Sequence, residues 1–233
     1  MTVSANAGIA LALGSYRVWV DVLHQKKEPG FSTVSRALLD AMVQHRDFQA
    51  PHAICVTHCH GDHHSPELLA RAMHRFPEAR IYHPDPDFPG GILLEEEAWE
   101  DSIGQLKLRF LRLPHAGKEQ LQCDHYGLLL SLEGRNILFA ADCETASPVL
   151  AQMVAGIEVH AAVLPFPWFT LPRGRQFLNE VLRPEQVILN HIPFGEDDCY
   201  GYREMIHREV DRNPLPMPCH ILSEPLQSIH LWI

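Results

Sequence analysis

No stretch of this chain of 233 residues is apolar over the roughly 18 residues that a membrane helix needs. Its first residues lack the basic segment that opens a signal peptide. Blocks of lysine or arginine are also absent, and the formal net charge is −10. An acidic chain lacks the electrostatic footprint of a protein that binds a nucleic-acid backbone. We therefore expect a cytoplasmic protein and do not expect it to bind membranes or long nucleic acids, while the composition is compatible with a homo-oligomer.

The six cysteines do not show the spacing of a secreted disulfide framework, and Cys55 lies within an apolar segment. We therefore expect reduced thiols. Hydrophobic residues make up 46% of the chain and charged residues 21%, which is ordinary for a globular protein. The length suits a single domain over residues 1–233.

One segment, from Ile54 to Ser65, concentrates the residue types that bind metal ions. Its sequence is ICVTHCHGDHHS. The apolar residues 53–56 predict a short buried strand, and Ser65 followed by Pro66 predicts the start of a helix. The polar residues therefore lie on a loop between a strand and a helix.

The spacing within this loop can bring several ligands together. His58 and His60 are two residues apart on a chain that leaves a strand, so their rings can point to the same side. Gly61 allows a tight turn, after which Asp62 and His63 can join the first pair. Imidazole and carboxylate ligands suit Zn2+, and also Fe or Mn. Because the chain has 16 histidines, the alternative is a surface loop that is rich in histidine by coincidence.

The segment from Thr57 to His63 resembles the signature of the metallo-β-lactamase-fold hydrolases. That resemblance implies an α/β fold, a four-layer αββα sandwich, and a site for two metal ions. It implies that the first two histidines bind one metal and that the aspartate and the next histidine help to bind the second. Three further ligands are implied downstream: a histidine, a bridging aspartate and a last histidine.

Three positions that follow strand-like segments match these implied ligands. The resemblance makes His115 the third histidine, with His125 as its rival, Asp142 the bridge and His191 the last histidine. Cys143 follows the bridge directly, and although cysteine can bind zinc, we expect it to be a packed neighbour. The predicted ligands are His58, His60, Asp62, His63, His115, Asp142 and His191.

Five other segments carry expectations that the structure can test. Asp21 ends a predicted strand, where a structural role is favoured over a catalytic one. His24–Gly30 is a predicted polar loop near the metal site, and contact between this loop and the substrate is one alternative. The acidic segment Gly91–Gln105 reads as a solvated face. Pro165–Phe169 is predicted to be a loop that either lines the substrate or packs as a hydrophobic plug, and His220–Trp232 is predicted to close a sheet as strand.

The resemblance implies hydrolysis by two divalent cations that share a water or hydroxide. Zinc is the expected metal, with Mn2+ or Fe as the alternatives, and Asp62 is the expected catalytic residue because it can orient the nucleophile. The substrate class is a small ester, lactone or phosphodiester, and the overall outline is most similar to the ascorbate-6-phosphate lactonase branch. The alternatives are a non-hydrolytic di-iron redox protein, a tRNA 3′-processing type of phosphodiesterase, and a scaffold that has lost its metal.

Overall fold

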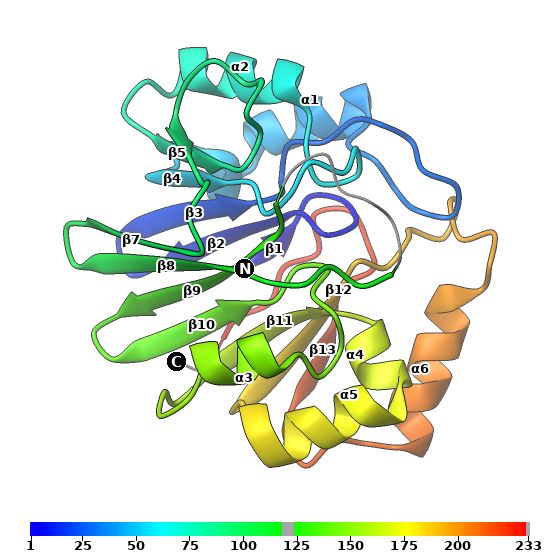
Figure 1. Ribbon diagram of the computed structural model, residues 1–233. Helices are drawn as coiled ribbons and strands as arrows, with labels where there is room; N and C mark the ends of the chain where they lie inside the picture. Colours follow the sequence, from blue (N-terminus) through cyan, green and yellow to red (C-terminus); the bar gives the residue numbers. More distant parts are fainter. Residues whose placement is uncertain (118–123, 232–233) are drawn as a thin grey trace.

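The computed structural model describes residues 1–117 and 124–231, and within them the strands form two mixed sheets (Figure 1). The first sheet follows chain order, and its strands are Thr2–Val3 (β1), Ile9–Leu13 (β2), Tyr16–Val20 (β3), Ala53–Cys55 (β4), Arg80–His83 (β5) and Ile92–Leu93 (β6). Strands β1 to β3 pair antiparallel, and β3 to β6 pair parallel. Leu13 pairs with Tyr16, so Gly14 and Ser15 form the hairpin turn between β2 and β3.

The second sheet has the order β13-β12-β11-β10-β9-β8-β7. Its strands are Ala98–Ile103 (β7), Leu106–Arg112 (β8), Tyr126–Leu132 (β9), Arg135–Phe139 (β10), Ala161–Pro165 (β11), Gln186–Asn190 (β12) and Cys219–Ile221 (β13). The strands from β7 to β10 pair antiparallel, whereas those from β10 to β13 pair parallel. The carboxyl ends of β10, β11 and β12 therefore meet at one edge of this sheet.

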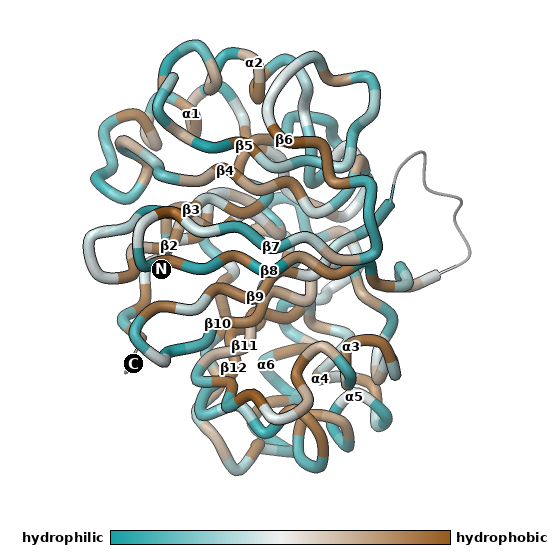
Figure 2. Tube along the Cα trace, turned by 60° about the vertical axis from the view of Figure 1, so that its left-hand side comes forward, coloured by the Kyte–Doolittle hydropathy of each residue, from teal (hydrophilic) through white to brown (hydrophobic). Residues whose placement is uncertain are grey.

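Helices cover the outer face of each sheet, so the layers run helix, sheet, sheet, helix (Figure 1). Helices Arg36–Gln44 (α1) and Pro66–Arg75 (α2) cover the first sheet, and Pro148–Met153 (α3), Pro167–Thr170 (α4), Pro172–Phe177 (α5) and Tyr202–Arg212 (α6) cover the second. Hydrophobic residues follow the strands of both sheets (Figure 2). One apolar cluster lies between the sheets, and each helical layer has its own. The predicted αββα sandwich is confirmed.

Local sequence explains the helix that follows the metal-binding loop. The Ser65 side chain accepts a hydrogen bond from the backbone N–H of Leu68, and Pro66 takes the first helical position, where its missing N–H costs nothing. Leu68, Leu69 and Ala72 are buried against the first sheet. Complete burial of a side chain such as Leu69 stabilises the fold by roughly 1.5–3 kcal/mol.

The acidic segment Gly91–Gln105 is solvated as expected at Glu95, Glu96 and Glu97, but it also contains an edge strand, β7, in which Trp99, Asp101 and Ile103 are half-buried. Two expectations about local structure are wrong. The segment Pro165–Phe169 is not a loop throughout, since helix α4 begins at Pro167, and the full burial of Trp168 and Phe169 favours the plug over the substrate wall. The closing strand is limited to Cys219–Ile221.

No helix in the described part of the chain is long and apolar enough to cross a bilayer. The thiols of Cys55, Cys143, Cys199 and Cys219 are free. Cys59 is disulfide-bonded, so the expectation of reduced thiols is wrong at this position, which lies in the partly exposed metal-binding loop.

Candidate metal centre

The predicted ligands converge because most of them follow the carboxyl ends of strands. The loop that begins at His58 follows β4, His115 lies three residues beyond β8, Asp142 lies three residues beyond β10, and His191 directly follows β12. Backbone hydrogen bonds from Ala116 to Asp142 at 2.7 Å and from Glu144 to Pro114 at 2.7 Å hold the second and third of these segments together.

The backbone is strained just beyond the ends of β3, β10 and β12. Asp21, Ala141 and His191 have φ angles of 52°, 46° and 57°, in the left-handed region that side chains other than glycine rarely adopt. Such strain persists only where the surrounding structure enforces it, and it concentrates at functional sites. Here it turns Asp142 and His191 toward the same cluster.

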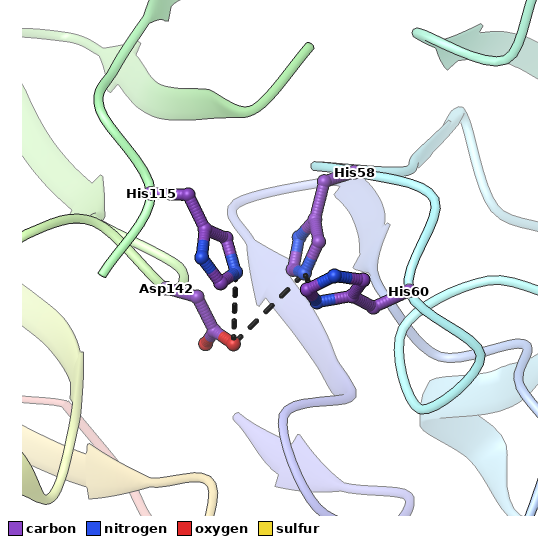
Figure 3. Close-up of side chains that lie close together, drawn as sticks. All are labelled: His58, His60, His115 and Asp142. Carbon is purple, nitrogen blue, oxygen red and sulfur yellow. Dashed lines mark hydrogen bonds and ion pairs between the residues drawn. The ribbon is translucent and has the colours of Figure 1, made fainter. Parts of the chain in front are cut away.

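One group of possible ligand atoms comprises His58, His60, His115 and Asp142 (Figure 3). The Nε2 atom of His58 lies 3.2 Å from Nδ1 of His60. The Oδ2 atom of Asp142 lies 3.7 Å from Nε2 of His115 and 3.9 Å from Nε2 of His58. Both ring nitrogens of His115 are buried and have no hydrogen-bond partner among the described residues. Buried polar atoms rarely stay unpaired, so this group fits a cation.

A second group comprises Asp62, His63 and His191, all of them buried. The Nε2 atoms of His63 and His191 lie 3.1 Å apart. The Oδ2 atom of Asp62 lies 3.4 Å from Nε2 of His191 and 4.0 Å from Nε2 of His63. Two imidazoles and a carboxylate that face one point are again a donor set that suits zinc or iron.

Asp142 connects the two groups. Besides its contacts within the first group, its Oδ2 atom lies 3.4 Å from Nε2 of His63 and 3.5 Å from Nε2 of His191. A single carboxylate oxygen therefore faces histidines of both groups. The structure brings all seven predicted residues together in an arrangement that is compatible with two metal ions, while coordination itself stays a prediction.

A chain of hydrogen bonds through Asp21 orients two of the histidines. Nδ1 of His63 donates to Oδ2 of Asp21 at 2.9 Å. The Thr57 hydroxyl donates to the same oxygen at 2.7 Å, and Nδ1 of His58 lies 3.0 Å from that hydroxyl, placed to donate to it. Both rings consequently present Nε2 to the cluster, as metal-binding histidines do when a carboxylate holds their other nitrogen. Asp21 has the structural role that was expected of it.

Two residues near the site escaped the sequence interpretation. Asn6 donates from Nδ2 to Oδ2 of Asp62 at 2.9 Å, and its own φ of 51° places it in a tight turn. The only local signal was an asparagine before Ala7-Gly8, which is typical of many turns. His24 was expected in a polar loop near the metal site, where a substrate contact was an alternative; it is fully buried and donates from Nε2 to the Ala5 carbonyl at 3.1 Å.

The buried charges of the cluster compensate one another. Burial opposes ionisation of Asp142, but His191 and His63 outweigh it and hold the pKa of Asp142 well below its usual value. Burial likewise opposes a positive charge on His63, yet Asp142 and Asp62 raise its pKa well above the ordinary value. The pKa of His191 is raised for the same reason, mainly by Asp142. Without metal, protons on these histidines therefore balance the carboxylates.

The third histidine had two candidates, and the geometry separates them. His115 belongs to the first group of ligand atoms, whereas His125 does not. His125 is buried and donates from Nδ1 to the Leu113 carbonyl at 3.2 Å, while its Nε2 has no partner. Burial lowers the pKa of His125 to about 4, so the ring is neutral at neutral pH. Both histidines line a cavity of about 750 Å³ beside the cluster.

Comparisons with known proteins give structural matches only. No protein-family model matches the sequence, and no curated protein matches it. The metallo-β-lactamase fold protein YhfI from Bacillus subtilis superposes with a TM-score of 0.63 at 14% sequence identity, over 94% of this chain and 90% of that chain. The chain has the metallo-β-lactamase fold.

Other proteins of similar structure carry different activities. An isothiocyanate hydrolase from Delia radicum gut bacteria gives a TM-score of 0.67 at 14% identity, over 98% of both chains. CmlA, a diiron β-hydroxylase from Streptomyces venezuelae, gives a TM-score of 0.65 at 17% identity over 99% of this chain. The chain spans about half of that hydroxylase, 53% of its length. Structural similarity at these sequence identities shows the metallo-β-lactamase fold only. The reaction has to be inferred from the residues of the site.

Replacement of Asp21 by asparagine tests the orientation of the histidines in this metallo-β-lactamase fold. Asparagine tolerates the left-handed backbone, but it has one acceptor oxygen. It therefore cannot accept from His63 and the Thr57 hydroxyl and also from the Thr57 backbone N–H, which donates to Oδ1 of Asp21 at 2.8 Å. We expect metal affinity to fall about 10–100-fold, the usual cost of removing a residue that orients a ligand. Competition with a chromogenic chelator measures this. Asp47→Asn is the matched control, because Asp47 is a buried carboxylate that accepts from Thr2 away from the cluster, and an equal loss in both variants would contradict the role of Asp21.

Single alanine replacements of His115 and His125 should separate their roles. His115→Ala is expected to lower the metal content from two equivalents per chain toward one, because it removes a ligand of the first group. His125→Ala should keep both equivalents. Elemental analysis of the purified variants measures the difference, and loss of metal in His125→Ala alone would make His125 the third ligand.

Proposed function

We propose that the chain is a binuclear metal-dependent hydrolase that acts on a small ester, lactone or phosphodiester. The observation that carries this proposal is the position of Asp142, whose Oδ2 atom faces histidines of both ligand groups at 3.4 to 3.9 Å. Zinc is the proposed metal, because imidazole supplies most of the donor set, and Mn2+ or Fe are the alternatives.

Two bound cations would supply an activated water and a positive centre for a substrate oxygen. The chain's own residues prepare the site for that chemistry. Asp21 and Thr57 fix the rings of His58 and His63, so that little reorganisation is needed when metal binds. Asp62 is the proposed catalytic residue, since its buried carboxylate belongs to the second group, is held by a hydrogen bond from Asn6, and can orient the nucleophile.

The cavity beside His115 is the proposed substrate pocket. Its ionisable residues besides the two histidines are Glu95, Glu97, Asp124 and Arg112, and the arginine is paired with Glu97 and Asp124 at 2.8 Å each. The walls are therefore net acidic, which disfavours a polyanion such as RNA. A small substrate that is neutral outside its scissile group fits this pocket, and the tRNA-processing alternative receives no support from it.

A di-iron redox protein is the second candidate, because the structure also resembles a diiron β-hydroxylase. Against it, imidazole supplies most of the donor set of this chain, which favours zinc. The identity of the bound metal distinguishes the candidates.

Elemental analysis of protein purified without added metal or chelator is the test. Two equivalents of zinc or manganese, with hydrolysis in a panel of aryl esters, lactones and phosphodiesters, would support the hydrolase. Two equivalents of iron with reducible absorbance and no hydrolysis would favour the redox candidate. Absence of metal even after reconstitution would refute both.

Metal affinity should rise with pH. Although burial opposes it, neighbouring carboxylates raise the pKa values of His63 and His191, so protons compete with metal for these rings up to a higher pH than at an ordinary histidine. Affinity is thus expected to increase as the pH approaches those raised pKa values and to level off above them. Calorimetric titration in buffers of different ionisation enthalpy counts the released protons, and a pH-independent affinity would contradict this.

A further inference from the structure

A second large cavity lies away from the metal centre, between helices α1 and α2 and the outer face of the first sheet. Its volume is about 580 Å³, within the range of ligand pockets. None of the seven predicted metal ligands lines it. It therefore belongs to a different part of the molecule from the proposed substrate pocket.

The interior of this cavity is apolar and aromatic. Trp19 lines it, with the ring of Phe76 5.4 Å and that of Phe48 6.0 Å from the Trp19 ring. The indole Nε1 of Trp19 already donates to the Asp47 carbonyl at 3.1 Å, so it offers no polar group to an occupant. Such an interior favours an alkyl chain.

Helix α1 does not close over this interior. Met42 is its buried residue, while Leu39 is half-buried and Val43 is 36% exposed, although all three line the cavity. Side chains that face an unfilled space lose the dispersion contacts they would otherwise make. An occupant between the helices would restore those contacts.

The rim of the cavity is cationic. Of the described residues that line it, Arg71, His74 and Arg75 are the ionisable ones, so no carboxylate lines it. The Arg75 guanidinium lies 5.4 Å from the centre of the Phe76 ring at the mouth. Within the described part of the chain, neither Arg71 nor Arg75 forms an ion pair. This arrangement is unusual on a protein with a net charge of −10.

We propose that this cavity binds an amphiphilic carboxylate, with its alkyl chain between α1 and α2 and its carboxylate at Arg71 and Arg75. Arginine is suited to this role because its planar guanidinium matches a carboxylate in two-point contact. The apolar interior would bind the alkyl chain of the ligand, and the two arginines would bind its carboxylate.

Calorimetric titration of the full-length protein with decanoate, below its micellar concentration, tests the proposal, with 1-decanol as the uncharged probe. We expect one saturable site and a rise in melting temperature. Arg71→Glu combined with Arg75→Glu should weaken decanoate binding about tenfold or more and change decanol binding little. Arg36→Glu is the matched control, since Arg36 is exposed on α1 and lies outside the cavity; it should leave both probes unaffected.

Leu39→Trp, which fills the cavity from its half-buried side, should abolish binding of both probes. Circular dichroism shows whether each variant is folded, and the charge-reversal pair lies on the surface, where it spares the core. Absence of saturable decanoate binding would overturn the proposal, as would an unchanged affinity in Leu39→Trp. A dimer in light scattering that dissociates in the charge-reversal variant would also overturn it, because a second copy would then cover the cavity.

Discussion

Asp142→Ala should release the metal pair and remove nearly all hydrolytic activity. The Asp142 carboxylate is half-buried among His58, His63, His115 and His191, and its Oδ2 atom faces all four. Without it, five imidazoles surround the two cations with a single remaining carboxylate, so the charge of the cations is less balanced. Because a metal pair contributes several kcal/mol to such catalysis, activity should fall by about 10²–10³-fold or more.

The measurement is the metal content per chain together with turnover of the best substrate from the panel. Asp211→Ala is the control, because Asp211 is an exposed carboxylate on α6 far along the chain from the cluster. Asp142→Asn should have an intermediate metal content, since one oxygen ligand remains. If Asp142→Ala keeps two equivalents of metal, Asp142 is not the bridge.

Phe110→Ala should produce the largest loss of stability among simple core replacements. Phe110 lies on β8, is 1% exposed, and packs its ring 5.1 Å from that of Tyr82 on β5, so it joins the two sheets. Removing a buried phenyl group from a close-packed core leaves a cavity, and the free energy of unfolding is expected to fall by about 3–5 kcal/mol.

Urea denaturation of the metal-free protein measures this loss without a contribution from bound metal. Phe110→Leu should lose less, because much of the volume remains. Leu171→Ala is the surface control, since Leu171 is 40% exposed, and it should change stability by less than about 0.5 kcal/mol. Similar midpoints for Phe110→Ala and Leu171→Ala would show that the contact between the sheets contributes little.

The positions of the candidate ligands were predictable where local sequence alone fixes them. His58 to His63 follow an apolar strand, Asp142 lies three residues beyond β10, and His191 directly follows β12, so each lies just after a hydrophobic segment. The choice between His115 and His125 was less secure, because both flank strands. It depends on the backbone pairing of Ala116 with Asp142, a contact between distant segments that no local pattern encodes.

The residues that support the candidate ligands could not be predicted from sequence patterns, because they too depend on contacts between distant segments. Asn6 and Asp21 act on Asp62 and His63 through contacts that exist only after the strands have paired. Strand β7 was missed because its alternation is carried by Trp99 and Ile103 among carboxylates, and such a pattern resembles a solvated surface until β8 pairs with it.

The ligands also come from both sheets: His58 to His63 from the loop after β4, and His115, Asp142 and His191 from loops of the second sheet. Bound metal would therefore connect the two sheets at the edge of the sandwich where these loops meet. A ligand present at about 1,000 times its dissociation constant stabilises the folded chain by roughly 4 kcal/mol. When the metal is removed, amide hydrogens at the carboxyl ends of β4, β10 and β12 should exchange with solvent faster than those at the amino ends of these strands.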